Sequence, residues 1–405
     1  MWLKCVPYFG INNNFNMNII NMMKLTYNNN IIIKFVLIFF IIIQHSLCIW
    51  ALKYIPPQDC EWKSNSNTNN HVPNSDNNIA LTCKLRTVNG PFDSQTTRNF
   101  SLIQPSSQTT SLTLLCDDLQ IQSSLSNRSF EHMNQLQELT IERCRFSELP
   151  SELFNGLYQL KNLTVRTYNN MRNDISLKIS SDSLLSPVQL LEKIDLSTNN
   201  INWLPPTMFC NLAHLQFVNL TANQFTEVIN VGFSNKNRYQ GSSSSLSCKL
   251  DTLSHLDLSF NRIKVLTDRG FGILSKLQVL QLHHNQISRA EETSLAGLSE
   301  LTILDLSNNQ LVALPPKFFT PISSQLTELH LQNNSISVLP PGLFNSLGQL
   351  VHLDLSHNEI TSHWIGPDTF SDLIRLVTLD LSFNRLRRID AATFRSQYSL
   401  QILEL

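Results

Sequence analysis

The side chains best suited to chemistry in this 405-residue chain are aspartates and histidines that recur at regular spacing. Carboxylates and imidazoles can transfer protons or bind metal ions. The carboxylates recur singly, however, without the loop hydroxyl or carbonyl groups that complete a calcium site. G-x-S-x-G, H-E-x-x-H, C-x-x-C and phosphate-loop motifs are absent from the sequence. We therefore predict a solvated carboxylate row, scattered exposed histidines, and no enzyme activity, cofactor or metal; a metal site or pH sensor is the alternative. The residues are Asp195, Asp257, Asp305, Asp354 and Asp380, with His283, His284, His330, His352 and His357.

The composition excludes some partners. The chain has 30 Lys and Arg against 31 Asp and Glu, a net charge of -1, and no basic block. A nucleic-acid partner would need clustered cations, so none is expected. Only 11 residues are Gly, which argues against phosphate-cradling loops. A hydrophobic content of 42% is sufficient for a large core.

The elements that position these residues come from an internal repeat. From residue 112 onward the chain repeats L-x-x-L-x-L-x-x-N-x-L, as in "LTILDLSNNQL" and "LVHLDLSHNEI". Successive Asn positions are separated by 24, 38, 24, 24, 25, 24 and 26 residues. Three degenerate units carry Asp117, Cys144 and Tyr168 at this position. The pattern is the leucine-rich-repeat signature. The Asn residues are Asn199, Asn223, Asn261, Asn285, Asn309, Asn334, Asn358 and Asn384.

Each repeat predicts one short parallel strand and one hydrogen-bonding Asn. The L-x-L leucines should point inward while the intervening residues face the concave surface. The Asn should bind backbone groups of neighbouring turns. A column of apolar residues ten positions after the Asn predicts an aromatic spine under the convex side. Its members are Phe154, Phe209, Phe233, Phe271, Leu295, Phe319, Phe344 and Phe394.

The predicted fold class is α/β, a leucine-rich-repeat solenoid or horseshoe with a parallel β-sheet on its concave face. We expect an Asn-rich leader and signal peptide at 1–48, a disulfide-stapled N-terminal cap at 49–110, and the solenoid at 111–405. The solenoid should hold about 11 repeats and a truncated one, with a polar insertion at 234–248.

The beginning of the chain predicts export. The apolar run 35–43 follows Lys34 and has the length of a signal-peptide core, too short to span ~30 Å of hydrocarbon. Cleavage is expected after Cys48; the rival interpretation is a signal anchor over 31–50. Translation could begin at Met22 or Met23, because the leader is long.

Six cysteines follow the leader, and an exported chain favours disulfides. Cys60 and Cys83 should staple the N-terminal cap. Cys210 and Cys248 each lie five residues before a strand leader, which predicts a bridge at the base of the insertion. For the pair Cys116 and Cys144, a bridge and buried free thiols are both open.

Five Asn-x-Ser/Thr sequons predict glycosylation at Asn99, Asn127, Asn162, Asn219 and Asn333. Asn219 should point outward from a concave strand, and Asn333 should lie just beyond another strand on the same side. Glycans there would obstruct the inner face. A protein ligand is then expected on a lateral rim or near the 234–248 loop.

The early segments carry a family resemblance. The run "LQELTIERCRFSELPSELFNGLYQLKNLTVRT", the N-terminal "CEW" and "LTCKLRTVNG", and "HWIGPDTFSDLIRLVTLDLSFNRLRRIDAATFRSQYSLQILEL" resemble the ectodomain start of the long insect Toll receptors, the 18-wheeler and Tollo kind. The resemblance covers roughly 58–405. It implies a plasma-membrane receptor with more repeats, one transmembrane helix and a cytoplasmic TIR domain. It also implies Spätzle-like cystine-knot ligands, receptor dimerisation, and roles in innate immunity or development.

Two function classes follow. The first is the extracellular ligand-binding part of a Toll-like receptor, truncated before the transmembrane and TIR segments because the chain stops at Leu405 inside a repeat. The alternative is a secreted or membrane-tethered leucine-rich-repeat adhesion protein with a cell-surface partner. The expected location is the cell surface for the full-length form, or secretion if the chain ends at 405.

Overall fold

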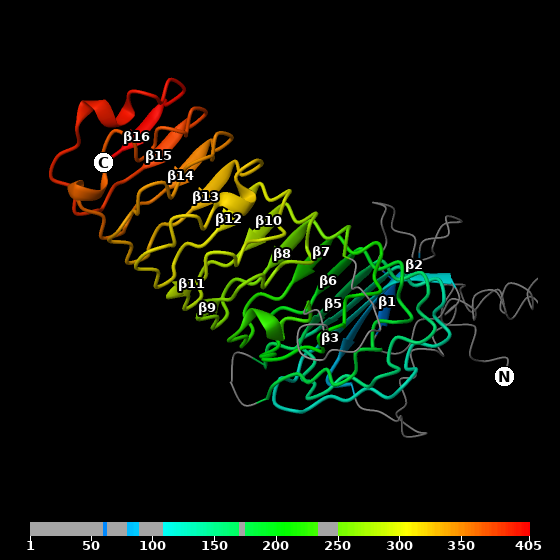
Figure 1. Ribbon diagram of the computed structural model, residues 1–405. Helices are drawn as coiled ribbons and strands as arrows, with labels where there is room; N and C mark the ends of the chain where they lie inside the picture. The colour runs from blue at the N-terminus through cyan, green and yellow to red at the C-terminus, as the bar shows by residue number, and fades with distance from the viewer. Residues whose placement is uncertain (1–59, 63–78, 89–107, 170–174, 234–249) are drawn as a thin grey trace, which may run out of the picture.

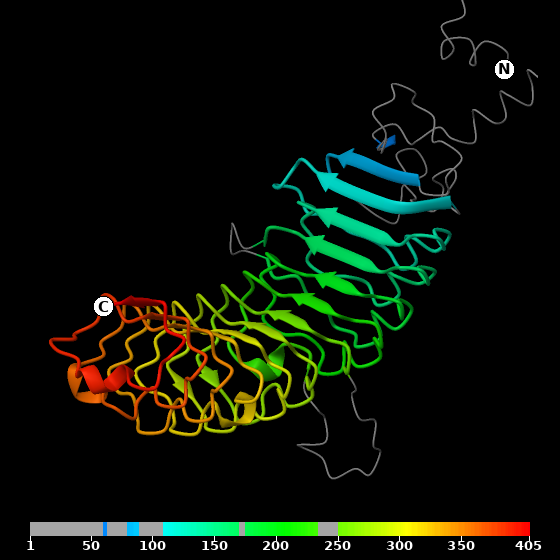
Figure 2. The same cartoon turned by 90° about the horizontal axis from the view of Figure 1, so that it is seen from above.

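The computed structural model describes residues 60–62, 79–88, 108–169, 175–233 and 250–405. They form a stack of turns that runs along a curved, elongated body, with one short strand per turn lining the concave side (Figures 1 and 2). The described helical segments are short 3-10 turns on the opposite side. The predicted parallel-strand solenoid is therefore confirmed.

In the part of the chain that the structure describes, fourteen strands form one sheet, and β1 to β8 followed by β10 and β12 to β16 lie side by side in chain order. All pairs are parallel except β1 and β2. A second sheet of β9 (Val265–Leu266) and β11 (Arg289–Ala290) lies off the main one. The fourteen strands are β1 (Cys60–Trp62), β2 (Ile79–Leu85), β3 (Thr109–Cys116), β4 (Glu138–Glu142), β5 (Asn162–Arg166), β6 (Lys193–Asp195), β7 (Phe217–Asn219), β8 (His255–Asp257), β10 (Val279–Gln281), β12 (Ile303–Asp305), β13 (Glu328–His330), β14 (His352–Asp354), β15 (Thr378–Asp380) and β16 (Ile402–Glu404).

The register of the sheet places equivalent residues of successive repeats directly opposite each other. Leu280, for example, pairs with Leu256 on one side and Leu304 on the other, and all three are buried. The residues that flank each buried leucine face the concave surface, because side chains alternate along a strand. Each turn therefore buries its apolar surface against two neighbouring turns. This shared burial is needed because a single repeat is not stable by itself.

The ladder asparagines bind the backbone of adjacent turns, as predicted. Asn285 donates from Nδ2 to the carbonyls of Leu258 and Leu282, at 2.9 and 3.0 Å. Its Oδ1 accepts the N–H of Ile263 at 3.0 Å. Asn309 and Asn358 repeat this arrangement one and three turns further on. Each amide thus satisfies buried groups where the chain leaves its strand.

The aromatic spine is present and contains one residue that the fixed spacing missed. Phe319, Phe344, Phe370 and Phe394 stack in sequence, with ring centroids 5.9 to 6.2 Å apart. Phe370 lies twelve residues after its ladder Asn instead of ten. The repeat that holds it is longer, and the η8 turn (Ser362–Trp364) absorbs the extra residues. Phe209 and Phe233 form a separate stacked pair at 4.9 Å.

Disulfides tie the first turns together. The predicted Cys60–Cys83 bridge joins β1 to β2 at a pair of opposed residues. Cys116 and Cys144 form a bridge between adjacent turns, so they are not free thiols. Cys210 is disulfide-bonded, while its predicted partner Cys248 lies outside the described residues. β2 lies within the expected cap yet already pairs in parallel with β3, so the parallel ladder begins before residue 111.

Candidate functional site

The carboxylate row on the concave strands has a structural task. Each of the five aspartates accepts the backbone N–H of the residue two positions later, at 2.8 or 2.9 Å. This is an Asx turn, which fixes the direction in which the chain leaves the strand. The D-x-S spacing is the sequence signal for it. The carboxylates are therefore half-buried turn residues, where a merely solvated row was expected.

Across β4 to β7, four polar side chains form one network on the concave face. Arg166 donates from Nη1 to Glu142 at 3.2 Å and from Nη2 to Asp195 at 2.5 Å. Asn219 adds a 3.0 Å hydrogen bond to the same Asp195 carboxylate. The hydrogen bond to Asp195 raises the pKa of Arg166. Burial works against the Asp195 carboxylate, but hydrogen bonds from Arg166 and Ser197 outweigh it, so the pKa of Asp195 is lowered.

The predicted glycosylation sites lie in different surroundings. Asn219 lies on concave strand β7 and Asn162 on β5, and the Nδ2 atom of each is already bound to a carboxylate. Asn127 and Asn333 are exposed, and Asn333 lies three residues after the end of β13. Asn99 lies outside the described residues. Glycosylation at all five positions stays a prediction.

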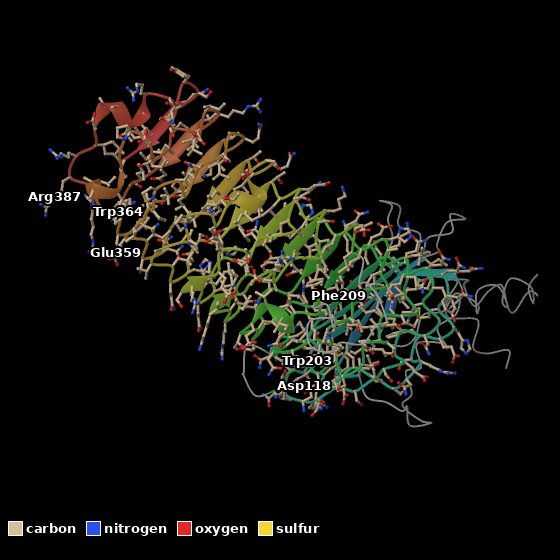
Figure 3. The ribbon with its side chains drawn as sticks, in the orientation of Figure 1. Asp118, Trp203, Phe209, Glu359, Trp364 and Arg387 are labelled. Atoms are coloured by element: carbon tan, nitrogen blue, oxygen red, sulfur yellow. A yellow bond between two sulfur atoms is a disulfide. The ribbon has the colours of Figure 1, made fainter. Side chains whose placement is uncertain are left out.

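An open hollow of about 660 Å³ lies where the chain leaves β6, β7 and β8, beside the sheet. Asn200, Gln224 and Arg262, each the residue after a ladder asparagine, line it together with Trp203, which is 44% exposed. The Oδ1 atom of Asn200 and the Oε1 atom of Gln224 are buried without a hydrogen-bond partner among the described residues. Figure 3 shows Trp203 on the lower side of the molecule in this view. Sequence spacing offered no signal for this hollow, since its residues come from three turns.

The histidines divide into separate groups. His283 and His284 pack around the exposed ring of Phe260, and His357 stacks on Phe383. His330 and His352 instead lie on adjacent strands, with ring centroids 5.1 Å apart. With Asp354 they make the one group of metal-ligating side chains that the described part of the chain brings together. The sequence interpretation, which treated all five as scattered, did not foresee this pairing.

Among the described residues, no helix has the length and apolar character to cross a bilayer.

Comparisons with known proteins agree with the repeat pattern. The family model for the leucine rich repeat matches residues 251–311 and 324–386, and that for the BspA type leucine rich repeat region matches 118–240. The chain belongs to the leucine-rich-repeat proteins. Within this class it is similar to Toll-type ectodomains, as the sequence resemblance implied. It is 36% identical to Toll-like receptor 7 of Drosophila melanogaster over 230 residues, which is 56% of this chain and 14% of that protein.

Solved structures show the same fold. The Drosophila Toll chain of a Toll–Spatzle complex superposes with a TM-score of 0.57 at 23% identity, covering 80% of this chain and 42% of that one. A TLR13–ssRNA13 complex gives 0.53 at 24% identity, covering 75% and 44%. The chain thus spans less than half the length of these two solved chains and 14% of the length of Toll-like receptor 7. The finer assignment to the long insect subgroup stays a prediction.

Proposed function

We propose that this chain is the extracellular recognition part of a Toll-like transmembrane receptor that binds a protein ligand, without catalytic activity. The observation that carries the proposal is the 36% identity to Toll-like receptor 7 over 230 residues. The structure is compatible with it, because a disulfide-tied hairpin opens a single sheet that continues through every described repeat.

The proposed contact surface is the hollow beside β6 to β8. Binding hot spots are enriched in Trp and Arg, and Trp203 and Arg262 both line this hollow. The amide side chains of Asn200 and Gln224 also line the hollow, and an amide can both donate and accept hydrogen bonds. The hollow also lies at the lateral position expected if glycans cover the inner face.

We propose an extracellular ligand of the cystine-knot, Spätzle-like kind. Support comes from the fold shared with the Toll chain solved in complex with Spatzle. Dimerisation on ligand binding, a cell-surface location, and signalling in immunity or development belong to the same proposal. The export signal lies outside the described residues and supports the location from sequence alone.

The test measures binding of the exported chain to purified cystine-knot proteins by surface plasmon resonance. Trp203→Ala should weaken binding by about 2 kcal/mol, or roughly 30-fold, if this ring anchors the ligand. Tyr398→Ala is the matched control, because Tyr398 is 89% exposed on a distant turn. Equal affinity of Trp203→Ala and wild type would remove the hollow from the proposal. No binding to any cystine-knot protein would remove the ligand class.

The alternative is an adhesion protein with a cell-surface partner. The repeat domain of FLRT2, solved in a complex with Latrophilin 3 and Unc5D, shares the fold with a TM-score of 0.51 at 21% identity. A bead-aggregation assay separates the two functions. Beads coated with the exported chain should stay dispersed if it is a ligand receptor, and should cluster with one another or with cells if it mediates adhesion.

A further inference from the structure

We propose that His330, His352 and Asp354 form a zinc site on the concave face of β13 and β14. The candidate ligand atoms of these three side chains all lie within 4.8 Å of one another. All three residues are half-buried, so a dissolved ion can reach them without opening the fold. The site is independent of the function proposed above.

The register of the two strands produces this cluster. His352 and Asp354 are two residues apart on β14 and therefore point to the same face. His330 on β13 is the direct neighbour of Asp354, and Glu328 is the direct neighbour of His352. Adjacent strands lie about 4.8 Å apart, so the four side chains stand at the corners of a small quadrilateral. Because these strands are hydrogen-bonded into the sheet, the backbone positions are fixed before any ion arrives.

The donor set favours zinc over calcium. Two imidazoles and one carboxylate suit zinc and similar transition metals, whereas calcium takes six to eight oxygen ligands. Ligand atoms around a tetrahedral zinc are about 3.4 Å apart, given bonds of about 2.1 Å. Rotation of the two imidazoles about their side-chain bonds can close the present spacing to that value. Three protein ligands would leave the fourth position open to water or to a side chain of a partner.

Neighbouring groups orient the ligands and add charge. The Oδ1 atom of Asp354 accepts the N–H and the hydroxyl of Ser356, at 2.9 and 2.7 Å, which leaves Oδ2 as the ligand oxygen. Such outer contacts tune a metal site by fixing its ligands. The Glu328 carboxylate lies 3.7 Å from Nε2 of His330 and adds a second negative charge beside the cation.

The chain contains an internal control for this inference. β8 carries the same triplet, His255-Leu256-Asp257, on the same face of the sheet. The residues opposite His255 are Phe217 and Val279, and those opposite Asp257 are Asn219 and Gln281. No second imidazole or carboxylate therefore stands beside the triplet on β7 or β10. The H-x-D triplet on β8 alone should therefore not bind zinc. On β14 the same triplet has Glu328 and His330 of β13 beside it, and His330 supplies the second imidazole.

The experiment is isothermal titration of Zn²⁺ into the full exported chain after treatment with a chelator. We expect one Zn²⁺ per chain. His330→Ala and His352→Ala should each weaken Zn²⁺ binding by about a hundredfold or more. Loss of a residue that only supports a ligand costs about 10- to 100-fold in affinity, and loss of a ligand itself should cost at least as much. His255→Ala should leave the affinity unchanged. Co²⁺ substitution should give a visible spectrum of a four-coordinate ion in wild type and His255→Ala, and lose it in the other two variants.

Several outcomes would overturn the proposal. Absence of Zn²⁺ binding by wild type is one, and unchanged affinity of the His330→Ala, His352→Ala double variant is another. Tighter binding of Ca²⁺ than of Zn²⁺ would contradict the donor argument. Circular dichroism and the thermal unfolding midpoint without metal should match among all variants, because these half-exposed side chains lie outside the core. A variant that fails this check is replaced by His352→Gln, which keeps side-chain volume and removes the imidazole.

Discussion

Each ladder asparagine binds the backbone of successive turns at once, which explains why no other side chain takes its place in the regular repeats. An amide offers two donors and an acceptor in one plane, and Asn285 uses all three on buried main-chain groups. Aspartate would lack the donors. The longer side chain of glutamine would not fit the same distance from the backbone.

Replacing Asn285 by Ala should therefore destabilise the solenoid strongly. The N–H of Ile263 would lose its partner, and burial keeps water from replacing it. The carbonyls of Leu258 and Leu282 would each lose one of two amide donors. We expect a loss of about 3 kcal/mol or more, measured as a shift of the urea unfolding midpoint. Ser288→Ala is the control, since that side chain is exposed in the same turn. A shift as small as that of the control would contradict the ladder argument.

The ion pair of Arg166 and Asp195 makes stability depend on pH. The folded-state pKa of Asp195 lies below its ordinary value of 3.8. Its stabilising contribution is thus complete above the unfolded pKa and is lost as the pH falls through the lower folded pKa. Between about pH 5 and about pH 2, Asp195→Asn should lose less stability than wild type.

The measurement is urea unfolding at a series of pH values. Arg166→Gln should reduce the same acid-dependent loss, because the carboxylate would no longer have the cation that holds its pKa down. Identical pH profiles of the three proteins would show that the pair does not contribute.

Residue contacts of this kind could be predicted from the sequence only where the repeat period fixes them. The ladder asparagines and the Asx-turn aspartates follow the period, so pattern analysis finds their positions. The partners of Arg166 lie on β4 and β6, at separations of 24 and 29 residues. The pairing of His330 with His352 likewise depends on strand register. Such cross-strand contacts need the three-dimensional alignment of the turns.

At the scale of elements, the disulfides hold the irregular first turns, where the ladder asparagine is missing. Cys144 occupies the Asn position of its repeat and is bonded to Cys116 of the preceding turn, with Cα atoms 4.9 Å apart. A covalent link between turns thus takes over part of the role that the amide has further along. The sequence left this pair open, because a buried thiol fits the same position.

Cys116→Ala with Cys144→Ala should reduce stability by about 3 to 4 kcal/mol, because the bridge closes 28 residues and restricts the unfolded chain. The measurement compares chemical unfolding of the double variant and wild type under oxidising conditions. With a reducing agent sufficient to open the bridges, the two should become similar. A double variant as stable as oxidised wild type would show that packing alone holds these turns.

The aromatic spine shows how irregular length defeats a fixed spacing. Phe344 and Phe394 follow the ten-residue rule, and Phe370 joins them two positions later. The longer repeat places Phe370 in the same stack because the 3-10 turn before it takes up the difference. The path of the longer loop decides which aromatic side chain reaches the stack. A fixed spacing in the sequence cannot predict this path.

At the scale of the whole molecule, contacts join each turn to its neighbours along the stack. The sheet order follows the chain order through all fourteen strands. The repeat predicts this order, since consecutive identical units can bury their apolar faces only by stacking. A break at one interface should therefore weaken the turns beside it and leave distant ones intact.

Gly297 is the position at which this can be tested. Its φ is +104°, and an added Cβ would lie 2.7 Å from the carbonyl oxygen of Gly272 in the preceding turn. Gly297→Val should therefore force adjacent turns apart at a cost of about 2 to 4 kcal/mol. Hydrogen exchange should accelerate in β10 and β12, while β4 and β5 keep wild-type protection.

Gly366→Ala supplies the control, because nothing lies within 4 Å of the added Cβ. It should leave exchange unchanged everywhere. If Gly297→Val accelerated exchange equally in β4 and β12, the stack would behave as one cooperative unit, and coupling would extend beyond nearest neighbours. If exchange rose only around residue 297 without reaching β10, the interface between turns would be weaker than shared burial implies. We expect protection from hydrogen exchange to be lost in the strands on both sides of residue 297 and kept in distant strands. That result would show that each turn is stabilised by contacts with its nearest neighbours.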